Sequence, residues 1–141
     1  MSTPSGLKVL FVAGFGPIVK EVAKSKQFYV DTLGLPLEPM PDNDSYYHGE
    51  KLAGVKHFAL WPLAQAAQSC FGKDAWPNAI PEPHSWIEFD VEDVASATRV
   101  LNDQGYKLLV EARKEPWGQT VTRMLSPEGL LVGITFTPWM R

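Results

Sequence analysis

The stretch SWIEFDVEDV contains two side chains whose types and spacing could do chemistry. Alternate residues of a β-strand point to the same face, so Trp86 and Glu88 share one face while Ile87 and Phe89 share the other. An indole ring can stack on a planar ligand or on a cation. A carboxylate beside it could recognise positive charge or act as a general acid or base. Core packing is the structural alternative for Trp86.

The role of Glu88 depends on what surrounds its carboxylate. An unpaired carboxylate among bulky aromatic side chains is costly to bury, so it must be solvated, paired or protonated. Arg123, in the otherwise apolar stretch TVTRMLS, is a candidate partner for an ion pair. In an enzyme the same two residues would be the catalytic pair, with Glu88 as the base and Arg123 as the partner of a developing oxyanion.

Further aromatic residues and one histidine are candidates for lining a binding cavity. The chain has five Trp, seven Phe and four Tyr, and tryptophan is costly to bury in a small core unless its N–H group finds a partner. Besides Trp86 and Glu88, the ligand-binding candidates are Phe15, Trp61, Trp117, Phe136 and His57. Core or turn packing is the alternative for the four aromatic residues, and a hydrogen-bonded core position is the alternative for His57. His48 and His84 lie in stretches typical of exposed loops.

The elements of the first half are a strand, a helix and further strands. Residues 7–15 are rich in Val, Leu and Phe and predict a buried strand. Apolar residues recur at helical spacing over 19–33, and Gly34 is a suitable helix stop. The proline-rich stretch LPLEPMPDNDSYYHGE predicts an edge strand and a loop. Residues 55–63 predict the next strand.

The same order restarts in the second half. Residues 85–92 predict a strand, and 94–101 an amphipathic helix with Asp93 as its N-cap and Gly105 as its stop. Three strands follow, in YKLLVEA, GQTVTRML and LLVGITFT. The two helix-ending glycines, Gly34 and Gly105, are 71 positions apart, which places Trp86 opposite Phe15.

This order predicts one domain, residues 1–141, built from two repeats over about 5–63 and 84–138. Residues 64–83 form the connector, with a short helix early in it. Two such units bury their apolar faces against each other, and the concave faces of their sheets can enclose a pocket.

Three stretches carry a resemblance to a known family: SKQFYVDTLGLPLE, FDVEDVASATRVLNDQGY and EPWGQTVTRMLSPEGLLVGITF. Together they resemble the vicinal oxygen chelate superfamily, which includes glyoxalases, extradiol dioxygenases and bleomycin-resistance proteins. The resemblance implies an α+β fold in which paired βαβββ modules form an incomplete barrel around a cavity. It also implies a homodimer, and in bleomycin-resistance proteins a segment similar to EPWG borders the binding groove.

The resemblance also indicates where a metal ion would bind. The four ligand positions of the metal-dependent members fall on Trp86, Gly133, His57, and Gly14 or Phe15. Only His57 among these has a suitable donor, whereas a divalent metal needs three or more donors at about 2.0–2.2 Å. We therefore expect no metal ion and no cofactor.

Composition and charge exclude several other classes. A net charge of −3 argues against nucleic-acid binding. The sequence lacks a signal-peptide pattern and any run of about 18 apolar residues, so we expect no membrane partner and a cytoplasmic location. Cys70 is the single cysteine and is expected to be a small buried thiol.

Two functions follow from these residues and the resemblance. The first is a metal-free small-molecule-binding protein of the glyoxalase/bleomycin-resistance type, which sequesters an aromatic or cationic antibiotic. The alternative is an enzyme, namely a glyoxalase-like lyase, isomerase or dioxygenase. Its metal would be held by displaced ligands such as His57 and Glu88, or Glu88 would act as a general base.

Overall fold

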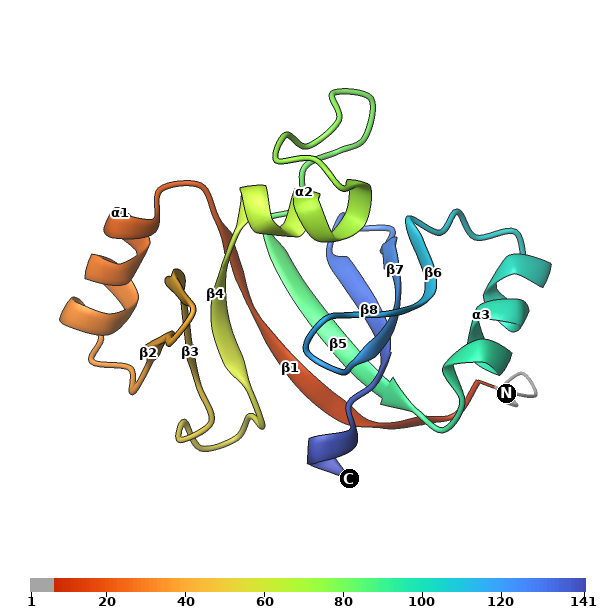
Figure 1. Cartoon of the computed structure of the whole chain (residues 1–141), viewed down its shortest axis with the longest axis horizontal. Helices are drawn as coiled ribbons and strands as arrows, with labels where there is room; N and C mark the ends of the chain where they lie inside the picture. Colours follow the sequence, from red (N-terminus) through yellow and green to blue (C-terminus); the bar gives the residue numbers. More distant parts are fainter. Residues whose placement is uncertain (1–6) are drawn as a thin grey trace.

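Strand β1 (Val9–Val19) runs through the middle of the structure, a computed structural model that describes residues 7–141 (Figure 1). Eight strands form one open sheet in the order β2-β3-β4-β1-β5-β8-β7-β6. The other strands are β2 (Glu38–Met40), β3 (Asn43–Gly49), β4 (Phe58–Pro62), β5 (Ser85–Val91), β6 (Val110–Lys114), β7 (Thr120–Leu125) and β8 (Leu131–Phe136). The sheet does not close into a barrel, so the α+β fold with an open barrel-like sheet is confirmed.

The helical segment of the first half is shorter than the sequence pattern suggests. It consists of α1 (Val22–Lys26) followed by a π-helical turn, η1 (Gln27–Thr32). Because β1 continues to Val19, the helix cannot begin there. Its end is as expected, since Gly34 has a positive φ of 73°, which glycine adopts without steric cost. The segment packs on one end of the sheet with Val19, Leu37 and Phe58.

The stretch between this helix and β4 holds an edge strand, as expected, and also one strand more than expected. β2 is the edge strand, whereas β3 is a sheet strand paired with both β2 and β4. The sequence of β3, NDSYYHG, lacks the β-branched residues that usually predict a strand. Hydrogen bonding to two neighbouring strands therefore stabilises β3 despite its weak strand propensity.

The connector contains the short helix expected early in it, α2 (Leu63–Phe71). Its apolar face, including Ala66, Ala67 and Cys70, packs with Trp61 and Trp86 in the core cluster at the middle of the sheet. Cys70 is buried as expected, and burial raises the pKa of its thiol to about 11. α2 therefore covers one end of the central strands (Figure 1).

The second half follows the sequence pattern closely. α3 (Val94–Asp103) begins at Asp93, whose side chain accepts a hydrogen bond from the backbone N–H of Ser96 at 3.1 Å. Its apolar face packs against β5 and β8 through Val91 and Ile134. No helix within residues 7–141 is long and apolar enough to cross a membrane.

Glycines in β1 allow the neighbouring strand β4 to approach it closely. β1 and β5 are antiparallel, with Gly16 opposite Trp86 and Gly14 opposite Glu88. A Cβ atom on Gly16 would lie 2.0 Å from the carbonyl oxygen of Ala59 on β4, so any side chain there would force the strands apart. Opposed residues of an antiparallel pair point to the same face. A Cβ atom on Gly14 would lie 3.1 Å from the Trp86 ring, so that ring occupies the space that a side chain at Gly14 would fill.

Candidate ligand-binding cleft

A cleft of about 510 Å³ lies on the face of the sheet that carries Trp86 and Glu88. Its lining includes four of the five tryptophans of the chain and one tyrosine. These aromatic residues are Tyr46, Trp61, Trp86, Trp117 and Trp139. Aromatic side chains are unusually suited to ligand clefts because they offer large rigid apolar surfaces with a polar edge.

Trp86 combines the two roles that the sequence leaves open. Its side chain is 4% exposed, and its Nε1–H donates a hydrogen bond of 3.2 Å to the carbonyl oxygen of Ala59. Trp61 packs edge-on against it, with ring centroids 6.1 Å apart. Trp86 is thus a core residue whose remaining surface forms the floor of the cleft.

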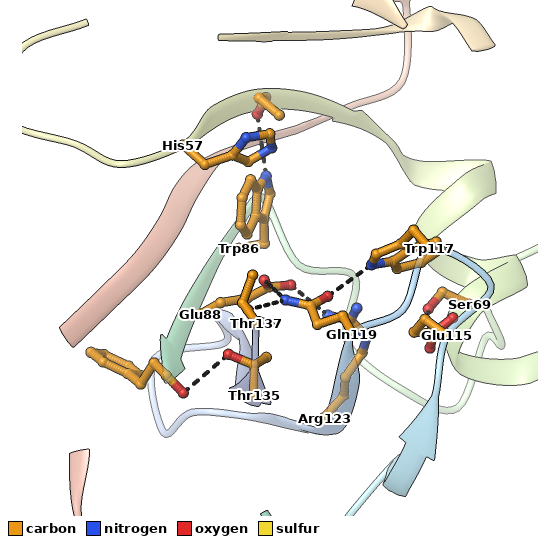
Figure 2. A network of polar contacts seen from close by, with 12 residues as sticks. His57, Ser69, Trp86, Glu88, Glu115, Trp117, Gln119, Arg123, Thr135 and Thr137 are labelled. Carbon is orange, nitrogen blue, oxygen red and sulfur yellow. Dashed lines mark hydrogen bonds and ion pairs between the residues drawn. The ribbon is translucent and has the colours of Figure 1, made fainter. Parts of the chain in front are cut away.

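A chain of polar contacts runs from the floor of the cleft to its mouth (Figure 2). The buried guanidinium of Arg123 pairs with Glu88 (Nη1 to Oε2, 3.2 Å). The amide of Gln119 donates to the other oxygen of Glu88 at 2.9 Å, and Trp117 Nε1–H donates to Gln119 Oε1 at 2.9 Å. We call Glu88, Gln119 and Arg123 the network wall. Of the alternatives that the sequence leaves open for Glu88, the structure thus shows the ion pair with Arg123.

Gly133 explains how the ion pair fits beneath the cleft. A Cβ atom at this position would lie 2.9 Å from Cγ of Glu88 and 3.5 Å from Nη1 of Arg123. The space that a larger residue would occupy is therefore filled by the side chain of Glu88. A side chain at Gly133 would have to displace that carboxylate.

The residues at the four family ligand positions do not fit a metal ion. Gly133 has no donor atom, Trp86 offers only an N–H that is already bonded to Ala59, and Glu88 next to them is held by Arg123. Within residues 7–141, no three His, Cys, Asp or Glu side chains converge so as to hold a metal.

A second polar group lines the cleft from the first half of the chain. The hydroxyl of Tyr46, on β3, lies 3.0 Å from Nε2 of His57, which directly precedes β4. Nδ1 of His57 lies 3.8 Å from Oε1 of Glu50. We call Tyr46, Glu50 and His57 the tyrosine wall. All three line the cleft.

Burial controls the protonation of the tyrosine wall. It lowers the pKa of His57 below its ordinary value of 6.5, which favours the neutral imidazole at pH 7. It also raises the pKa of Tyr46, so the hydroxyl keeps its proton. His48, which the sequence pattern places in an exposed loop, lies on β3 and lines the same cleft. Its ring stacks on Tyr46, with centroids 5.9 Å apart.

The mouth of the cleft is bordered by two half-exposed tryptophans. Trp117, in the turn between β6 and β7, is 51% exposed, and Trp139, in the short helix η2 (Pro138–Met140), is 55% exposed. An ion pair next to η2 fixes this helix on the sheet: the guanidinium of Arg141 lies 3.1 Å from the carboxylate of the buried Asp90. Thr137 also donates its backbone N–H to Asp90 at 2.8 Å.

Two predicted ligand-binding residues lie outside this cleft. Phe15 is opposite Ile87, so it points to the other face of the sheet, where its ring packs edge-on against Phe58. Phe136 follows Ile134 by two positions and shares its face, away from the cleft; the guanidinium of Arg141 lies 4.7 Å from its ring. His57, Trp61, Trp86, Glu88 and Trp117 all line the cleft, together with Arg123.

Several residues that line the cleft were not predicted from the sequence. Tyr46 and Glu50 belong to a stretch interpreted as edge strand and loop, and Gln119 is an uncharged residue that directly follows EPWG but was not itself singled out. Trp139 follows the last predicted strand. The one signal that could have indicated Tyr46 and Trp139 is the aromatic surplus itself, since binding clefts are enriched in such side chains.

Fold and site together define an open-sheet protein with one aromatic cleft and no fitting metal site at the family's ligand positions. The sequence profile of the Glyoxalase/Bleomycin resistance protein/Dioxygenase superfamily matches residues 15–134. The chain belongs to this superfamily. A comparison with curated proteins finds no match.

Solved structures of the same fold are similar over nearly their whole length. A glyoxalase/bleomycin resistance protein/dioxygenase superfamily member from Vibrio splendidus 12B01 has 18% identity and a TM-score of 0.55, and the match covers 92% of this chain and 97% of that one. Methylmalonyl-CoA epimerase from Mycobacterium tuberculosis has 18% identity and a TM-score of 0.57, over 99% and 95% of the two chains. The epimerase from Streptomyces coelicolor, in complex with 2-nitronate-propionyl-CoA, has 16% identity and a TM-score of 0.56, over 93% and 99%. At these identities the likeness extends to the fold alone.

Proposed function

We propose that this protein binds a small aromatic or cationic organic molecule in the cleft without using a metal ion, and that sequestration of an antibiotic is the most concrete form of this activity. The observation that carries the proposal is the gathering of four tryptophans and a tyrosine around a single cleft. Such surfaces supply affinity through apolar contact and stacking, with no chemical step required.

The network wall supports a binding role for the cleft floor. Both carboxylate oxygens of Glu88 already accept hydrogen bonds, from Gln119 and from Arg123. Glu88 thereby holds these two side chains in fixed orientations beneath the ligand. A rigid polar floor with aromatic surfaces above it favours one orientation of a planar molecule.

The alternative is a metal-free lyase or isomerase with Glu88 as general base and Arg123 as oxyanion partner. It needs Glu88 to take up a proton from a substrate, and protonation of Glu88 would leave the buried guanidinium of Arg123 without its counter-charge. Binding is therefore the better-supported function. A homodimer, as the family resemblance implies, stays a prediction.

Tryptophan fluorescence provides the test. Titration with 2-naphthamide, a neutral planar probe, should quench the emission of the cleft tryptophans. Trp117→Ala and Trp139→Ala should each weaken its binding about 2- to 10-fold, as expected for the loss of one aromatic contact. Phe28→Ala is the matched control, because Phe28 is an equally exposed aromatic residue outside the cleft. If both tryptophan variants bound 2-naphthamide as tightly as the unaltered protein does, the binding site would have to lie elsewhere.

A further inference from the structure

The charges that line the cleft are unevenly balanced. Glu88 and Arg123 neutralise each other at 3.2 Å, which leaves Asp42 and Glu50 as the remaining charged lining residues. In the part of the chain that the structure describes, no Lys or Arg side chain lies within ion-pair distance of either carboxylate. With the pKa of His57 lowered by burial and its imidazole neutral, the charged lining residues carry an excess of negative charge. A cationic group would be attracted there.

The tyrosine wall can accept hydrogen bonds from such a group. A carboxylate near Nδ1 of His57 favours the tautomer that carries its proton on Nδ1. Nε2 is then the acceptor, so the hydroxyl of Tyr46 donates to it across 3.0 Å. With its own proton engaged, the oxygen of Tyr46 is left with lone pairs that can accept a hydrogen bond from a ligand.

The geometry points to a subsite for a hydrogen-bond-donating organic cation, an amidinium or protonated amine, formed by the oxygen of Tyr46 and the carboxylate of Glu50. The inference rests on the proposed function, because the aromatic body of the same molecule would contact the tryptophans of the cleft. The network wall is a poor site for this cation, since Arg123 is itself positive and its partner Glu88 is already bonded.

Protonation of His57 should switch this subsite off. The titratable groups that face His57 are Tyr46 and His48 from β3, Glu50 after β3, and Glu88 from β5. An imidazolium would donate from Nε2 to the oxygen of Tyr46, and the tyrosine proton would turn toward the cleft. An acceptor would become a donor, with a new positive charge behind it. Because burial lowers the pKa of His57, this change occurs below pH 6.5.

Three naphthalene probes separate charge from hydrogen bonding. 2-Naphthamidine is cationic and donates hydrogen bonds, 2-naphthamide is its neutral isostere, and 2-naphthyltrimethylammonium is a cation without N–H groups. We expect the amidinium to bind at least about 10-fold more tightly than the amide and about 3-fold more tightly than the trimethylammonium ion. Equal affinities for amidinium and amide would overturn the subsite.

Variants of the tyrosine wall test the residues themselves. Tyr46→Phe and Glu50→Gln should each weaken amidinium binding about 5-fold or more and leave amide binding within about 2-fold. Glu128→Gln is the matched control, because it removes one negative charge from an exposed turn outside the cleft. Circular dichroism checks that each variant is folded. Equal losses for amidinium and amide would contradict the assignment.

The pH dependence identifies the switch. Amidinium affinity of the unaltered protein should fall from about pH 7 to about pH 5, while His57→Gln should remove this dependence and His48→Gln should retain it. A slope unaffected by His57→Gln would exclude the switch. If the amide binds but the amidinium has no advantage, the subsite is wrong and the proposed function stands. If none of the three probes binds, both are wrong.

Discussion

The two polar walls of the cleft differ in how their charges are balanced. In the network wall, Glu88 and Arg123 pair with each other and Gln119 completes the contacts of the carboxylate. In the tyrosine wall, Glu50 has only a neutral imidazole nearby, and its side chain is 59% exposed. Charged groups that are paired within the protein stabilise its structure. Charged groups without such a partner can interact with a ligand. We therefore expect the network wall to contribute stability and the tyrosine wall to contribute ligand selectivity.

Breaking the network wall should have the largest effect on stability. Glu88→Ala would leave the guanidinium of Arg123 buried without its counter-charge, and such losses cost about 3–5 kcal/mol. We expect the free energy of unfolding, measured by urea denaturation, to fall by this amount. In the double variant Glu88→Ala, Arg123→Met much of the loss should be recovered.

Tyr46→Phe is the matched variant from the tyrosine wall. It removes one half-buried hydroxyl and one hydrogen bond, a loss of about 0.5–1.5 kcal/mol. If Tyr46→Phe destabilised the protein as much as Glu88→Ala, the division between a structural wall and a ligand-selective wall would be wrong.

A loss smaller than that of Glu88→Ala is expected when the space beneath the network wall is filled. Gly133→Ala puts a methyl group 2.9 Å from Cγ of Glu88, and overpacking of this kind costs about 1–3 kcal/mol. Thermal unfolding followed by circular dichroism measures it. In a Glu88→Ala background the same substitution should cost much less. An unchanged cost there would mean that the clash is with the side chain of Thr135, at 3.3 Å, rather than with Glu88.

The smallest expected effect is the contribution of His57 to the pH dependence of stability. In the unfolded chain His57 titrates near 6.5, whereas burial lowers its pKa in the folded chain. Between the two pKa values only the unfolded chain binds the proton, so the free energy of unfolding should fall as the pH drops below 6.5. Urea midpoints between about pH 7 and about pH 5 should show a steeper slope than those of His57→Gln. If the urea midpoints of the two proteins changed with pH in parallel, His57 would not contribute to the pH dependence of stability.

The sequence predicts the strands well where apolar and polar residues alternate clearly. It predicts them less well where the pairing between strands determines which face a side chain points to. Period-two alternation in β5 correctly places Trp86 and Glu88 on the cleft face. The repeat offset of 71 fails for Phe15, because it is counted through the two helical segments, and only the first of them contains a π-helical turn, Gln27–Thr32. A slip of one residue moves a side chain to the other face of a sheet. Phe15 therefore lies opposite Ile87 rather than beside Trp86.

The polar partners in the cleft were predictable only in part. Arg123 is a charge inside an apolar strand, and such a residue needs a nearby counter-charge, which made Glu88 a natural partner. Gln119 and Tyr46 carry no such conflict in the sequence. Their roles arise from the tertiary arrangement of a hairpin and a strand with Glu88 and His57. Local patterns contain no information about these distances.

The packing of Glu88 over Gly133 makes the order of substitutions matter for this fold. A carboxylate introduced at Gly133 alone would collide with Glu88 and bring a second negative charge beside it. Removal of Glu88 alone would strand Arg123. Both of these single steps toward a metal-ligating cleft are therefore unfavourable, although a coordinated set of changes need not be. The ion pair thus opposes the stepwise acquisition of a metal site, and metal-site engineering would have to change Glu88, Arg123 and Gly133 together.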